Sequence, residues 1–79
     1  ETQTIRFNYY GPSVEAVLDK FPMAKVVDKQ EGVCSIEAEV FGTGVKMWLL
    51  SQGSKVKVTA PETLVQEMKQ EIEKMDDWY

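Results

Sequence analysis

The sequence predicts a small domain of the α+β class, and three observations lead to this class. Apolar and polar side chains alternate over residues 4–9, 33–41 and 55–59, which is the period of strands with one buried face. Between these segments, apolar residues recur every three to four positions, the period of amphipathic helices. The chain has 79 residues, of which 43% are apolar, enough for one hydrophobic core.

Seven elements are expected, in the order strand, helix, strand, strand, helix, strand, helix. Their predicted ranges are 4–9, 14–21, 24–29, 33–41, 44–52, 55–59 and 64–79. The second and third strands form an antiparallel hairpin across a short turn that contains Gly32. The first helix ends before Pro22, because a residue that precedes proline is pushed out of helical geometry.

Capping residues set the boundaries of the other two helices. Thr43 is the expected N-cap of the second helix, and Gly53 suits a left-handed residue that ends it. Thr63, with Gln66 three residues later, resembles a capping box at the start of the last helix.

This order is a split βαβ unit repeated twice, so we expect a ferredoxin-like βαββαβ sandwich with an additional C-terminal helix. Right-handed connections place both inner helices on one face of the sheet. The other face is polar, and the last helix is expected to cover part of it. The side chains predicted on this face are Arg6, Asn8, Ser35, Glu37, Glu39, Lys55 and Lys57.

Residues 1–79 are expected to form a single domain, excised from the C-terminal end of a larger protein, since Glu1 stands where Met would open a chain. The chain has no His and one Cys, Cys34, an inventory that excludes a structural zinc site and most nucleophile–base pairs. We therefore expect that the protein is not an enzyme and that it binds neither a metal nor a cofactor. A lone cysteine, no signal peptide and no long apolar run predict a cytoplasmic protein without a membrane span.

The net charge of −4 is unevenly distributed. Acidic and basic residues balance up to Pro61, and the whole excess lies in residues 62–79, which contain the last predicted helix. Surfaces that follow a phosphate backbone are normally basic, so this chain is not expected to bind DNA itself.

Three residues are candidates for contacts. Arg6 is the only arginine, and on an open sheet face its guanidinium would suit a carboxylate or phosphate. A cross-strand pair with Glu37 or Glu39 is the alternative for Arg6. Trp78 and Tyr79 end an otherwise solvated helix and are candidates for an interface.

The second half of the chain resembles a known family. Residues 48–53 read Trp-Leu-Leu-Ser-Gln-Gly, a valine-rich strand then ends at Pro61, and the last helix carries Leu64, Met68 and Ile72. This order is similar to the C-terminal extension, or WCX region, of bacterial WYL-domain transcriptional regulators. The Thr43-Gly44 opening and the acidic tail depart from the pattern.

The resemblance implies a parent protein with an N-terminal helix-turn-helix that binds DNA, a central WYL domain and this extension. It implies that the WYL and WCX regions sense an effector and support a homodimer, and that Arg6 contacts the effector. A different class remains open, an ACT-like domain that binds a small molecule. Such domains carry a glycine-containing loop after the first strand, for which Gly11 is the candidate.

Overall fold

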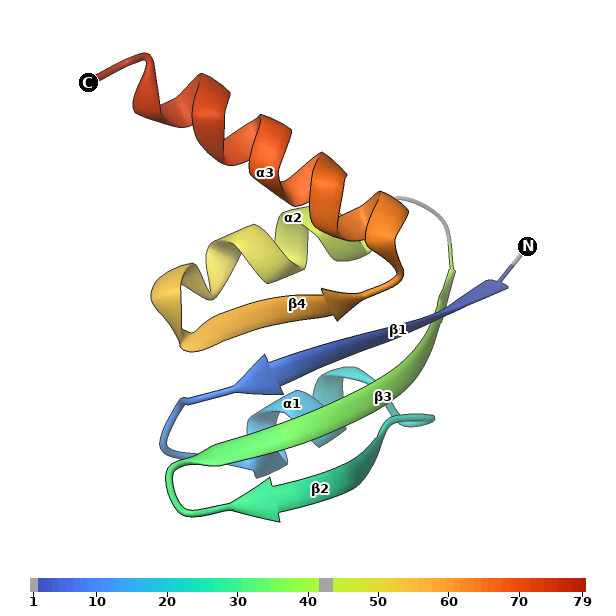
Figure 1. Ribbon diagram of the computed structural model, residues 1–79. Coiled ribbons are helices and arrows are strands. Elements are labelled where there is room, and N and C mark those ends of the chain that lie inside the picture. Colours follow the sequence, from blue (N-terminus) through green and yellow to red (C-terminus); the bar gives the residue numbers. More distant parts are fainter. Residues whose placement is uncertain (1, 42–43) are drawn as a thin grey trace.

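The computed structural model describes residues 2–41 and 44–79 and confirms the α+β class and the expected order of elements (Figure 1). A short 3-10 turn, Gly53–Lys55, precedes the last strand. The elements are β1 (Thr2–Tyr9), α1 (Val14–Lys20), β2 (Lys25–Gln30), β3 (Val33–Phe41), α2 (Gly44–Ser51), β4 (Val56–Ala60) and α3 (Glu62–Asp76).

The four strands form one antiparallel sheet in the order β2-β3-β1-β4. β1 and β3 are the central pair, and their register is unbroken from Thr2 opposite Phe41 to Tyr9 opposite Cys34. The β2–β3 hairpin closes through a two-residue turn in which Gly32 has a φ of 81°. Glycine adopts this left-handed conformation without steric cost, which explains its place in the turn.

One face of the sheet carries the hydrophobic core. The alternating side chains of β1 and β3 on this face are buried against Val17 of α1 and Leu49 of α2. Phe7, Phe21 and Trp48 meet edge to face at its centre, with ring centroids 4.9 to 6.4 Å apart. Burial of each large apolar side chain contributes about 1.5–3 kcal/mol. Both inner helices therefore cover the same face of the sheet (Figure 1).

The last helix joins this helical face. Leu64 is buried in the core, Met68 packs against it, and Lys46 of α2 lies 3.9 Å from Glu71 of α3. The prediction that this helix covers the polar face is therefore wrong. Figure 1 shows α3 running from the end of β4 toward a C-terminus that lies away from the sheet.

Two predicted boundaries also need correction. α3 begins at Glu62, directly after Pro61, and no side chain caps it, so Thr63 is not an N-cap. Gln66 instead donates a hydrogen bond to the Glu62 carboxylate (2.6 Å). Lys55 belongs to the 3-10 turn and not to β4, and its carbonyl accepts a hydrogen bond from the backbone N–H of Tyr10 (2.7 Å). The predicted left-handed Gly53 is confirmed at a φ of 62°, and Thr43 lies outside the described residues.

Candidate functional site

Arg6 and Glu37 form an ion pair at the centre of the polar sheet face. They are direct partners in the β1–β3 register. The Arg6 Nη2 and Nε atoms lie 2.7 and 2.9 Å from the same carboxylate oxygen, Oε2 of Glu37. Lys25 of β2 approaches the other oxygen, Oε1, at 3.6 Å. The cross-strand pair that the sequence left open is thus formed with Glu37 and not with Glu39.

This pair remains open to solvent on its arginine side. The Arg6 side chain is 56% exposed, whereas that of Glu37 is 21% exposed. The hydrogen bond and positive charge of Arg6, with the charge of Lys25, hold the pKa of Glu37 below its ordinary value. Glu37 is therefore ionised at neutral pH, and the three groups together carry one net positive charge. An incoming carboxylate or phosphate can compete with Glu37 for Arg6.

Polar contacts continue on both sides of this cluster. Ser35 donates a hydrogen bond to Oδ1 of Asn8 across the same two strands (2.9 Å). Toward the other end of the strands, a hollow of about 220 Å³ borders the cluster. It is lined by Thr4, Met23, Lys25, Glu37 and Glu39. The polar face thus offers a charged site with room beside it.

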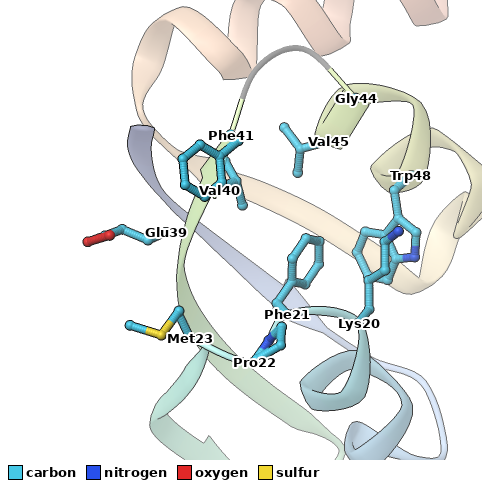
Figure 2. A pocket seen from close by; sticks show the side chains of 10 residues that line it. All are labelled: Lys20, Phe21, Pro22, Met23, Glu39, Val40, Phe41, Gly44, Val45 and Trp48. Carbon is cyan, nitrogen blue, oxygen red and sulfur yellow. The ribbon is translucent and has the colours of Figure 1, made fainter. Parts of the chain in front are cut away.

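An apolar groove of about 500 Å³ lies on the side of the sheet that α1 and α2 cover. Figure 2 shows its side chains gathered where the end of α1, the end of β3 and the start of α2 meet. Its charged members are Lys20 and Glu39, and its apolar lining comes from Phe21, Pro22, Met23, Val40, Phe41, Val45 and Trp48. Trp48 packs against the core as well as lining this groove. The sequence pattern did not indicate the groove, because its walls come from three separate elements.

A second cavity, of about 470 Å³, lies at the opposite end of the sheet. Gly11 of the loop after β1 borders it, together with the β2–β3 hairpin and the first turn of α1. The loop singled out in the sequence as a possible ligand loop therefore does border a cavity.

The exposed end of α3 forms a third feature, separate from Arg6. Trp78 is 84% exposed and Tyr79 is fully exposed. Ile72 and Met75, which continue the stripe of Leu64 and Met68, are also exposed. The structure thus leaves the two predicted interface residues exposed just beyond the end of α3, at Asp76, and does not bring them to the sheet face.

Residues 2–41 and 44–79 contain neither a metal-binding cluster nor a helix that could span a membrane. No three His, Cys, Asp or Glu side chains are grouped so that they can hold a metal ion. In the same part of the chain, every helix is too short or too polar to cross a membrane.

These features define a small α+β domain with a charged open sheet face and an apolar helix end. A family model, the WCX domain, matches residues 1–75. The chain therefore belongs to the WCX family, the C-terminal region of WYL-domain transcriptional regulators that its sequence resembles. No curated protein matches the chain.

Proposed function

We propose that this WCX domain is the effector-sensing and dimerisation module of a DNA-binding transcriptional regulator of the WYL-domain family. The observation that carries the proposal is the family match over residues 1–75. In the proposed parent protein, the DNA-reading helix-turn-helix and the neighbouring WYL domain lie outside this chain. The protein acts in the cytoplasm.

The effector contact is assigned to the polar face around Arg6. Two Arg6 nitrogens, Nε and Nη2, contact one oxygen of Glu37, and the Arg6 side chain is 56% exposed, so the guanidinium remains accessible from solvent. A planar guanidinium binds a carboxylate or phosphate through two parallel hydrogen bonds. Glu37 holds Arg6 in position before the effector arrives, and Lys25 adds a second positive charge at the same place. An anionic group of the effector is the expected ligand.

The subunit contact is assigned to the exposed end of α3. Ile72, Met75, Trp78 and Tyr79 place large apolar side chains in solvent on one short segment. Exposed apolar patches of this kind are characteristic of protein interfaces. Burial of these side chains in a homodimer would remove them from water.

Regulation follows from a shift between two conformations of the regulator, which differ in the spacing of their DNA-reading domains. An effector that binds one spacing of the DNA-reading domains more tightly than another shifts the regulator toward that spacing. The domain itself does not bind DNA, because its net charge is −4 and the whole excess lies in residues 62–79. It performs no catalysis, and for its fold we propose the ferredoxin-like class, which the sheet order β2-β3-β1-β4 supports.

The test is Arg6→Ala in the regulator that contains this domain, with Lys57→Ala as the matched control. Lys57 lies on the same polar face, opposite Asn8, and its loss removes the same charge. Operator binding is measured with and without effector, and thermal unfolding is measured on both variants. The proposal expects Arg6→Ala to weaken the effector response while its melting temperature stays close to that of the control. An unchanged effector response would remove Arg6 from the site.

A further inference from the structure

We propose that residues 38–41 of β3, which we name the β3 edge, bind an extended segment of a partner protein beside the apolar groove. The segment adds a strand to the sheet. It carries a basic side chain opposite Glu39 and large apolar side chains at the two neighbouring positions, opposite Ala38 and Val40. This inference does not rest on the Arg6 site or on the dimer contact of α3.

The β3 edge exists because β3 is longer than its neighbour β2. The pairing of β2 with β3 extends only to Lys25, which lies opposite Glu37. On the other side of β3, the pairing with β1 continues to Thr2, opposite Phe41. Figure 1 accordingly shows β3 running past the start of β2 toward the N-terminus of the chain. Residues 38–41 are therefore paired with a strand on one side only.

The backbone of the β3 edge retains hydrogen-bonding groups for a further strand. Successive residues of a strand direct their N–H and C=O groups to alternate sides. Alternate residues of the β3 edge therefore direct these groups to the side that β2 leaves open. Within residues 2–41 and 44–79, neither a strand pairing nor another hydrogen bond engages that side. An unpaired edge of this kind is a template for an added strand, which supplies main-chain hydrogen bonds.

The apolar groove provides room for side chains of the added strand. It has a volume of about 500 Å³, and Val40 of the β3 edge is part of its lining. Phe21 and Trp48 also line it, with their ring centroids 4.9 Å apart. Side chains of directly opposite residues on neighbouring strands point to the same face of a sheet. An apolar residue opposite Val40 therefore points into the groove.

The rim of the groove carries large apolar side chains in solvent. Phe41, at the end of the β3 edge, is 77% exposed, and Met23, just before β2, is 73% exposed. Both line the groove, and Figure 2 shows them at its two ends. Exposed apolar surface of this kind marks binding grooves and protein interfaces. A strand that runs along the β3 edge would cover both side chains.

Glu39 sets the charge of the partner segment. Its side chain is exposed, and among the described residues it belongs to no ion pair, because Lys25 contacts Glu37 instead. Opposite charges on directly opposed strand positions attract, so a lysine or arginine opposite Glu39 completes a pair. Lys20, the other charged lining residue, lies on the far side of the groove from Glu39 (Figure 2). The aliphatic stem of a lysine can cover apolar surface while its ammonium group stays in water.

A second copy of this chain fits the β3 edge less well than a partner segment does. Its strand β4 has a basic residue, Lys57, between two valines, but Val56 and Val58 pack against the core of their own copy. These valines therefore cannot enter the groove of a neighbour. The C-terminal segment 71–79 is acidic, and its residues up to Asp76 are helical, so their backbone is already hydrogen-bonded. An acidic segment is also repelled by Glu39.

The probe is a short fluorescent peptide, Ser-Thr-Leu-Lys-Leu-Thr-Ser, with both ends blocked. Its lysine is matched to Glu39 and its leucines to Ala38 and Val40. A second peptide has glutamate in place of the lysine. Fluorescence anisotropy of each peptide is measured with the 79-residue chain. We expect saturable binding of the lysine peptide with a Kd below about 1 mM, and binding of the glutamate peptide at least ~5-fold weaker.

Charge reversal in the chain tests the position opposite the lysine. Glu39→Lys should invert the preference, so that the glutamate peptide binds more tightly than the lysine peptide. Glu67→Lys makes the same change at an exposed position of α3 and should leave the preference as it is. Met23→Ser removes an apolar side chain from the rim and should weaken both peptides. An uninverted preference in Glu39→Lys would overturn the assigned position.

Backbone methylation separates an added strand from simple apolar contact. One lysine peptide carries N-methyl groups on its leucines, and another carries them on its lysine and threonines. Only alternate N–H groups of an added strand face β3, so we expect one methylated peptide to lose binding and the other to keep it. Equal binding of the two, or no saturable binding of the unmethylated lysine peptide, would overturn the added strand. Peptide binding that competes with self-association of the chain in sedimentation would assign the β3 edge to a second copy and overturn the partner segment.

Discussion

Arg6 and Glu37 lie directly opposite each other on β1 and β3, and two guanidinium nitrogens converge on a single carboxylate oxygen at 2.7 and 2.9 Å. The second oxygen of Glu37 is left to Lys25 at 3.6 Å. Arg6 is therefore held in place on one side and open to solvent on the other. This geometry pairs Arg6 with Glu37 and leaves the Arg6 side chain 56% exposed.

The pair predicts a pH-dependent stability. Because the pKa of Glu37 is lowered in the folded chain, its contribution is complete above the ordinary glutamate pKa and is lost as the pH falls through the folded-state value. Glu37→Gln should therefore reduce the free energy of unfolding at neutral pH and have no effect in strong acid. Urea unfolding at both pH values measures this difference.

Glu39→Gln is the control for that measurement. Glu39 is exposed on the same strand and face, and it forms no ion pair among the described residues. If both variants lose the same stability at neutral pH, the Arg6–Glu37 pair does not stabilise the fold.

The core predicts a large effect at Leu49. The Leu49 side chain lies on the buried side of α2 and is 1% exposed, whereas that of Met47, on the same helix, is 65% exposed. Leu49→Ala should lower the free energy of unfolding by about 2–5 kcal/mol, because it leaves a cavity in the core. Met47→Ala should change it by less than about 0.5 kcal/mol. Chemical unfolding of the two variants checks the packing, and equal losses would contradict it.

Two glycines predict opposite outcomes for the same substitution. Gly32 has a φ of 81°, and a Cβ there would touch nothing. Gly32→Ala should therefore destabilise the fold by about 1 kcal/mol through backbone strain alone. Gly44 opens α2 without a positive φ or a close contact, so Gly44→Ala should be neutral or stabilise by up to ~1 kcal/mol. Thermal unfolding distinguishes them, and a stabilised Gly32→Ala would refute the turn geometry.

The end of α3 predicts a concentration-dependent dimer. Ile72→Glu places a charge in the exposed apolar stripe and should raise the dissociation constant at least ~10-fold. Gln70→Glu adds the same charge at another exposed position of α3 and should leave the dimer unchanged. Sedimentation equilibrium measures both. A wild-type chain that stays monomeric at all concentrations would remove this surface from the proposed interface.

β1, β3 and β4 were predictable because one buried face imposes an alternation of apolar and polar residues, whereas β2 is exposed at every position. Ile5, Phe7 and Tyr9 point inward for this reason, and the polar positions of β3 between Ile36 and Val40 point outward. The partner of Arg6 was not predictable, because Glu37 and Glu39 share a face and only the register selects Glu37.

Features that combine residues from distant segments could not be predicted from the sequence pattern. The stripe from Leu64 to Met75 indicates that α3 packs somewhere, but not that it packs beside α2. Lys29, Cys34 and Tyr9 form one row across the sheet only once three strands are in register. Thr63 and Gln66 have the spacing of a capping box, but Thr63 lies inside the helix. The N-cap position is occupied by Pro61, and α3 begins at the next residue, Glu62.

We propose that Arg6 contacts an effector in addition to pairing with Glu37. Exchange of the two residues, Arg6→Glu with Glu37→Arg, keeps opposite charges at the same register positions. In the regulator that contains this domain, we expect the exchange to restore the stability lost in Arg6→Glu alone. The effector-dependent change in operator binding should stay impaired. A swapped protein that recovers both its stability and its effector response would contradict the claim and leave Arg6 with a purely structural role.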